Sequence, residues 1–133
     1  MKNSTTWLRI SYWVGAAADG LVALAMFSEM ILGHTSPLTH YQPEAPYRYA
    51  IGLAGSLMLG WTILLLWADR KPVERRGVLI LTCIVVLALM CTGVFAISLR
   101  YLPLGTGISV LVFQVFLIIL FGGSYFASRR QNP

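Results

Sequence analysis

Charge is scarce in this sequence. Asp, Glu, Lys and Arg make up 11% of its 133 residues, against roughly 25% in a typical soluble domain. The scarcity is uneven: residues 78–99 contain no charged side chain, whereas six of the eight residues from Asp69 to Arg76 are charged. Together with a hydrophobic content of 57%, this distribution excludes a soluble globular core and is typical of membrane spans joined by short loops.

Motifs for several kinds of chemistry are missing. No histidine falls within the long apolar segments, which excludes haem held between membrane helices. The two cysteines, Cys83 and Cys91, lie within one apolar segment and do not form the Cys-x-x-Cys pair of disulfide exchange, so we expect packed thiols. No glycine-rich phosphate loop or pair of nucleophile and base is visible. We therefore expect no enzyme activity and no cofactor.

The segment from Gly33 to Tyr49 is rich in proline and tyrosine and contains both histidines. His34, His40 and Glu44 could together approach a metal ion, but their spacing matches no compact ligand motif, so we expect no metal site. The tyrosines of this segment are predicted to lie at a membrane interface.

Four segments are long and apolar enough to cross a bilayer, which takes about 20 residues per helix. They do not alternate apolar and polar residues as the strands of a membrane barrel do, so they are predicted to be helices. Only about 40 residues remain outside them, too few for a second core. The sequence thus predicts one transmembrane domain over residues 1–133, an all-α integral membrane four-helix bundle with spans at residues 8–32, 49–68, 78–99 and 104–127.

Lysine and arginine predict the orientation, because they are enriched on the cytoplasmic side of membrane proteins. Eight of them fall on one side of the predicted spans: Lys2, Arg9, Arg70, Lys71, Arg75, Arg76, Arg129 and Arg130. The other side has only Arg48 and Arg100. We expect an inner-membrane protein with both termini in the cytoplasm.

The loop between the second and third spans is strongly basic. Its cations are Arg70, Lys71, Arg75 and Arg76. At the depth of anionic lipid headgroups each would be attracted by about 1 kcal/mol, so these four residues are predicted to contact headgroups. Pro72 suits the first position of a helix and Glu74 its first turn, which predicts a tight hairpin at this point.

The stretch GWTILLLWADRKPVERRGVLILT, Gly60 to Thr82, resembles small four-span prokaryotic membrane proteins of uncharacterised function. The resemblance implies a multipass membrane protein and implies no particular activity.

Two stripes of small residues predict where the first two spans meet, since close helix contact in lipid depends on small side chains. The stripes are Ala16, Gly20 and Ala23 in the first span, and Gly52, Ser56 and Gly60 in the second. Because the two spans are sequential and antiparallel, we expect Gly20 and Ser56 to lie at the same depth and the helices to cross there.

Asp19 is an acid in the middle of the first span. It lies ten residues beyond Arg9, about 15 Å along a helix, close to the centre of a hydrocarbon core about 30 Å thick. No cation shares this depth. The polar side chains that do are Ser56, Cys91, Thr92 and Gln114, and of these only Gln114 can both donate and accept with reach. We predict a protonated Asp19 hydrogen-bonded to Gln114 as a structural contact between the first and fourth spans. The alternative is an acid that binds protons or cations in a membrane cavity.

Glu29 is the second acid of the first span. The ten residues from Asp19 to Glu29 turn the helix by about 1000°, which is 80° less than three full turns. The two side chains therefore point about 80° apart, and the two carboxylates lie on adjoining faces of the helix. Arg48 and Arg100 are near its depth, and we expect an ion pair with one of them. The alternative is that Glu29 borders the same cavity as Asp19.

Two interpretations of function follow. The first is a structural or accessory membrane protein held together by small-residue packing and the Asp19–Gln114 contact. The second is a small ligand-binding or proton- or cation-coupled transport protein that uses Asp19 and Glu29. Expected partners are membrane lipids and either further copies of the chain or a larger membrane complex. The net charge of +5 follows from membrane orientation and does not indicate nucleic acid.

Overall fold

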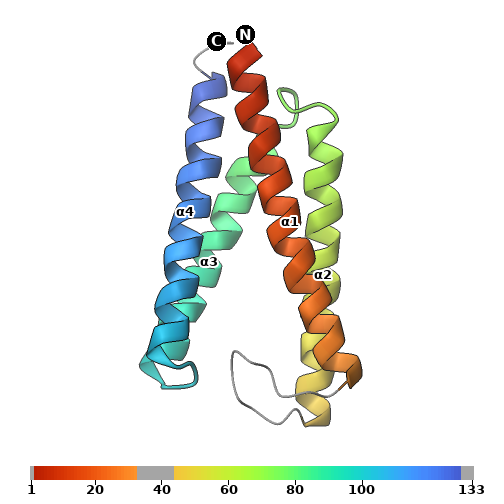
Figure 1. Cartoon of the computed structure of the whole chain (residues 1–133), viewed down its shortest axis with the longest axis vertical. Helices are drawn as coiled ribbons and strands as arrows, with labels where there is room; N and C mark the ends of the chain where they lie inside the picture. Colours follow the sequence, from red (N-terminus) through yellow and green to blue (C-terminus); the bar gives the residue numbers. More distant parts are fainter. Residues whose placement is uncertain (1, 33–43, 130–133) are drawn as a thin grey trace.

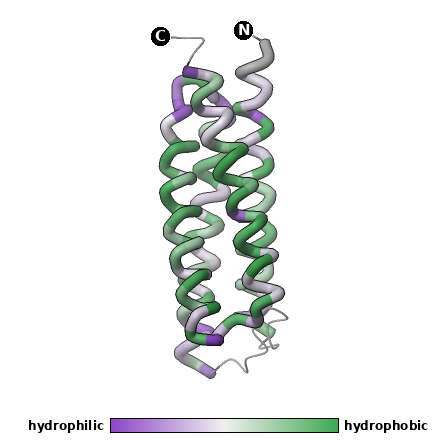
Figure 2. The backbone as a smooth tube through the Cα atoms, turned by 90° about the vertical axis from the view of Figure 1, so that its left-hand side faces the viewer, coloured by the Kyte–Doolittle hydropathy of each residue, from purple (hydrophilic) through white to green (hydrophobic). Residues whose placement is uncertain are grey.

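The computed structural model describes residues 2–32 and 44–129 of the chain. Within these ranges it contains four helices, α1 (Lys2–Leu32), α2 (Ala45–Asp69), α3 (Gly77–Ser98) and α4 (Leu104–Arg129). All four are long and apolar enough to cross a membrane. Figure 2 shows apolar residues along the length of the helices and hydrophilic residues gathered mainly at the two ends. The prediction of an all-α protein with four candidate spans is therefore confirmed.

The helices form two antiparallel hairpins, α1 with α2 and α3 with α4 (Figure 1). The hairpins meet at the end where α1 begins and α4 ends, and there α1 also contacts α4. Toward the opposite end the two hairpins diverge (Figure 1). We call residues 5–19, 60–86 and 117–129 the closed half, and residues 20–32, 44–59 and 87–116 the splayed half.

The core shared by both hairpins lies in the closed half. It consists of Leu8, Tyr12, Ala16, Leu65, Ala68, Leu79, Leu117 and Phe121. In the splayed half the buried residues are small ones between the two helices of a single hairpin, such as Ala23, Gly52 and Gly107. Large apolar side chains there are exposed, as with Leu57 at 76%, which suits contact with lipid tails.

The loop between α2 and α3 is a tight hairpin, as expected, but α3 begins later than Pro72. Residues 70–76 form turns in which the Arg75 N–H donates to the Lys71 carbonyl at 3.0 Å. The helix starts at Gly77, so Pro72 and Glu74 belong to the loop and the prediction of their helical positions is wrong. Proline pre-sets a turn as readily as a first helical residue, because both need the same φ.

The predicted packing of α1 on α2 is correct for α1 and only partly correct for α2. Ala16 and Ala23 are buried, and a Cβ placed on Gly20 would lie 3.5 Å from Thr62 Cγ2. On α2, Ser56 is exposed and a Cβ on Gly60 would meet no atom within 4 Å. The expected crossing of Gly20 at Ser56 is therefore wrong.

The helix contact on α2 runs through Gly52 and Gly55 instead. A Cβ on Gly52 would collide with the Met30 side chain, and one on Gly55 would lie 3.2 Å from Met26 Cβ. The reason is geometric: each four-residue step advances about 400°, so a strict four-residue stripe drifts about 40° per step around the helix. Gly60 therefore lies about 80° around α2 from Gly52 and turns away from α1.

Candidate functional site

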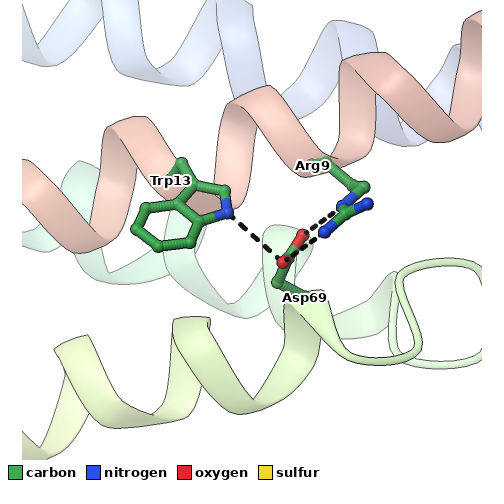
Figure 3. Close-up of polar contacts among 3 residues, drawn as sticks. All are labelled: Arg9, Trp13 and Asp69. Atoms are coloured by element: carbon green, nitrogen blue, oxygen red, sulfur yellow. Dashed lines mark hydrogen bonds and ion pairs between the residues drawn. The ribbon is translucent and has the colours of Figure 1, made fainter.

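An ion pair joins α1 to the end of α2 in the closed half (Figure 3). Arg9 Nε lies 3.1 Å from Asp69 Oδ1 and Arg9 Nη2 lies 3.3 Å from Asp69 Oδ2. Trp13, one turn further along α1, donates its indole N–H to Asp69 Oδ2 at 3.3 Å. The distribution of Lys and Arg predicts only a role in orientation for Arg9 and does not predict this pair. The available signal is that Arg9 and Asp69 both lie at the cytoplasmic ends of their predicted spans.

The basic loop contacts the helices of the closed half through two of its four cations, Arg75 and Arg76, and through one carbonyl, while Lys71 pairs within the loop. Arg75 stacks on the Trp67 ring at 3.4 Å from its centroid and donates to the Trp67 carbonyl. The Tyr12 hydroxyl donates to the Arg75 carbonyl at 3.0 Å. Two further contacts are Arg76 Nη1 to the Ser128 carbonyl at 3.4 Å and Lys71 Nζ to Glu74 Oε2 at 2.9 Å.

The polar contact between α1 and α4 is made by serines. Ser11 Oγ and Ser124 Oγ lie 2.7 Å apart and share a buried hydrogen bond. Ser124 also donates to the Trp7 carbonyl at 3.4 Å. A polar contact between the first and fourth spans is thus present, but two turns nearer the start of α1 than Asp19.

Asp19 lies at the boundary between the closed and splayed halves. Leu8, Tyr12 and Gly15 are buried on one face of α1, and a Cβ on Gly15 would touch both Leu65 and Phe121. Asp19 follows Gly15 by four residues and so continues this core-facing stripe. Its side chain is half-buried and makes no hydrogen bond or ion pair within the described residues.

Gln114 has the corresponding position on α4. It precedes the core residues Leu117 and Phe121 by three and seven positions, which places it on the same stripe. The pairing of Ser11 with Ser124 sets the register. Eight residues further along α1 and eight back along α4, Asp19 is level with Phe116, and Gln114 lies about half a turn further into the splayed half. Gln114 Oε1 is buried with no hydrogen-bond partner in the described part of the chain. The expected Asp19–Gln114 hydrogen bond is therefore not formed there.

Glu29 and Ser56 have other partners than those expected. Glu29 Oε1 accepts a hydrogen bond from the Tyr47 hydroxyl at 3.0 Å. The Arg48 guanidinium donates to the Met30 carbonyl at 2.6 Å and so caps the end of α1. Glu29 forms no ion pair with Arg48 or Arg100 among the described residues. Arg48 binds backbone carbonyls instead. Ser56 donates to the Gly52 carbonyl of its own helix.

Arg100 lies in the connection between α3 and α4. It has a left-handed backbone with φ of 57°, and the Tyr101 N–H donates to the Ala96 carbonyl at 2.9 Å. This is the hydrogen-bond pattern that commonly ends a helix, usually with glycine at the left-handed position. Arg100 therefore has a backbone role in the α3–α4 turn.

The remaining candidate residues are the two cysteines, the possible metal ligands and the basic residues near the chain ends. Cys83 is half-buried and Cys91 is exposed, and both are free thiols. Within residues 2–32 and 44–129 no three His, Cys, Asp or Glu side chains are grouped as metal ligands. His34, His40 and Arg130 lie outside the described residues, as does the side chain of Lys2.

Four helices of the described residues are long and apolar enough to cross a membrane, which indicates a multipass membrane protein. In comparisons with protein-family models, curated proteins and solved structures, nothing matches the chain.

Proposed function

We propose that the protein is a small inner-membrane protein of structural or accessory type whose splayed half receives a transmembrane helix of a partner chain. The observation that carries this proposal is the position of Asp19 and Gln114. Both lie on core-facing stripes where the hairpins begin to diverge, and neither Asp19 nor Gln114 Oε1 has a hydrogen-bond partner within the described residues. In lipid, polar side chains are costly until they are hydrogen-bonded, and a partner helix would supply those bonds.

The closed half supports this proposal because it fixes the two hairpins at one end. The Arg9–Asp69 pair holds α1 to α2, and the Ser11–Ser124 bond holds α1 to α4. The Tyr12 hydroxyl adds a contact to the α2–α3 loop. With one end fixed, a helix that enters the splayed half does not need to separate the shared core.

Orientation is part of the proposal. With both termini in the cytoplasm, as the eight-to-two division of Lys and Arg favours, the closed half lies at the cytoplasmic surface. The splayed half then lies in the outer part of the membrane.

Photocrosslinking in native membranes tests the proposal. Val22 follows Gly15 by seven residues on the stripe of Asp19 and is 40% exposed. Leu21 is 68% exposed and points about 120° away from Gly15, so it is the matched control. A photoreactive phenylalanine at position 22 should give a protein product of defined mass, and one at position 21 should give none. A product of twice the chain mass identifies a second copy, and any other mass identifies a different protein.

Dependence on Asp19 separates specific docking from chance contact. The position-22 product should persist with Asp19→Asn, which still hydrogen-bonds, and disappear with Asp19→Leu. Equal products at positions 21 and 22, or a product insensitive to Asp19→Leu, would contradict the proposal.

A second candidate function is favoured by the contact of Glu29. Glu29 lies in the part of α1 that belongs to the splayed half and accepts a hydrogen bond from the Tyr47 hydroxyl. Asp19 and Glu29 are thus two acids placed in succession along α1 toward the outer end. In this alternative Asp19 and Glu29 bind protons or a small cationic ligand. It requires that Asp19→Asn folds normally but abolishes a proton- or cation-dependent activity, and that no protein product forms at position 22.

A further inference from the structure

The four cations of the α2–α3 loop differ in what they contact. Lys71 pairs with Glu74, Arg75 stacks on Trp67, and Arg76 donates to the Ser128 carbonyl. Arg70 is exposed and makes no hydrogen bond or ion pair with any described residue. Its guanidinium therefore remains available to an anion outside the chain.

An apolar groove ends at this arginine. It has a volume of about 280 Å³ and is lined by Ile63, Leu66, Trp67 and Arg70. Successive members of this set are three, one and three residues apart in the sequence. They therefore share one face of the last two turns of α2, and Arg70 follows directly after the helix. The three apolar side chains are 59%, 38% and 47% exposed, in chain order. Because α2 is a candidate span, this face lies against lipid and the arginine lies where the span reaches the membrane surface.

Positive charge is uncompensated around the groove. The two described carboxylates of this end, Asp69 and Glu74, are already paired with Arg9 and Lys71. Arg75 lies over the Trp67 ring that forms one wall of the groove. The charged end of the groove is thus complementary to an anion, while the rest of it is complementary to a hydrocarbon chain.

We propose that this groove is a binding site for one anionic phospholipid. The phosphate oxygens accept hydrogen bonds from the Arg70 guanidinium, whose planar donors match phosphate geometry. One acyl chain lies along Ile63, Leu66 and the Trp67 ring. The sequence predicts that four basic residues contact lipid headgroups. This proposal assigns specific binding of a lipid to one of them, Arg70, and to one face of α2. It does not depend on a partner helix in the splayed half.

Tryptophan quenching by brominated lipids tests the site. The full chain is placed in phosphatidylcholine vesicles that contain the same fraction of either brominated phosphatidylglycerol or brominated phosphatidylcholine. The quenching due to Trp67 is obtained by subtracting the signal of a Trp67→Phe variant, since the chain has four tryptophans. Brominated phosphatidylglycerol should quench Trp67 more strongly than brominated phosphatidylcholine.

Two charge variants decide whether the preference belongs to the groove. Arg70→Gln should lower the preference for phosphatidylglycerol at Trp67 about fivefold, because the hydrogen bonds from the guanidinium to the phosphate are lost. Arg129→Gln removes the same charge from an exposed position outside the groove at the same end of the bundle and should lower this preference less. Equal quenching of the unmodified chain by the two lipids, or equal losses in the two variants, would overturn the proposal.

Discussion

Arg9 and Asp69 stand 60 residues apart in the sequence and form a two-point ion pair between α1 and the last residue of α2. The Asp69 side chain is only 11% exposed, whereas that of Arg9 is 59% exposed. A carboxylate so far removed from water needs several donors, and Arg9 with Trp13 supplies three N–H groups. The pair therefore fixes the end of α2 against α1 and contributes to holding the closed half together.

Asp69→Asn should lower the free energy of unfolding by about 1 to 2 kcal/mol, because charge-assisted hydrogen bonds are lost from a largely buried site. The partial exposure of Arg9 keeps the effect below that of a fully buried pair. The measurement is unfolding in mixed micelles at increasing SDS. Glu74→Gln is the control: it breaks a pair whose side chains are 57% and 66% exposed, and it should cost less than about 0.5 kcal/mol. Equal costs for the two variants would show that Asp69 has no special role.

Ser11 and Ser124 should be coupled in their contributions to the free energy of unfolding. Ser11→Ala and Ser124→Ala together should cost less than the sum of the single changes, with a coupling of about 0.6 kcal/mol, typical of hydrogen bonds between membrane helices. Ser109→Ala provides the control, since Ser109 is exposed and bonds only to the Gly105 carbonyl of its own helix. A double-mutant cycle in the same unfolding assay measures the coupling. Strict additivity would show that the two hydroxyls do not interact.

Span positions could be predicted from the sequence because the length of an apolar run depends on the bilayer and not on neighbouring helices. Helix contacts could not be predicted to the same extent. In lipid the outward face of a span is as apolar as its inward face, so periodicity does not tell Ser124, which is buried, from Ser109, which is exposed. The similar level of Asp19 and Gln114 along the bundle could be predicted from their places in the two spans. Their lack of a mutual hydrogen bond could not be predicted, because the divergence of the two hairpins leaves no signal in either helix alone.

Gly52 and Gly60 provide a matched test of the contact between α1 and α2. Gly52→Leu should cost about 1 to 3 kcal/mol, the range for overpacking, because its side chain would enter the space of Met30. Gly60→Leu has open space around its Cβ position and should not destabilise the protein in this way. The unfolding assay compares them. A larger loss for Gly60→Leu would restore the original prediction of a stripe through Ser56 and Gly60.

Labelling in intact cells tests the orientation. In a background with Cys83 and Cys91 replaced by serine, a cysteine introduced by Glu44→Cys should react with an impermeant maleimide. Lys71→Cys should not react until the cells are opened. Both native side chains are exposed, so burial does not explain a difference between them. The reverse pattern would place the termini and the closed half on the outer side.

Asp19 provides the test that separates the two candidate functions. Its stripe faces the core, and its carboxyl group has no hydrogen bond or ion pair among the described residues. An ionised carboxylate at the level where α1 leaves the shared core would therefore have neither a hydrogen-bond donor nor a cation among those residues to stabilise its charge. We therefore expect a neutral acid, whose carbonyl stretch appears in the infrared spectrum and disappears in Asp19→Asn. If Asp19 bonds a partner helix, Asp19→Asn should retain the position-22 crosslink, since an amide can replace a neutral acid as donor and acceptor. If it carries protons, Asp19→Asn should fold equally well but lose proton-dependent activity, since an amide does not titrate. A spectrum with no carbonyl band lost on mutation would show that Asp19 is ionised, and its partner would then have to carry a positive charge.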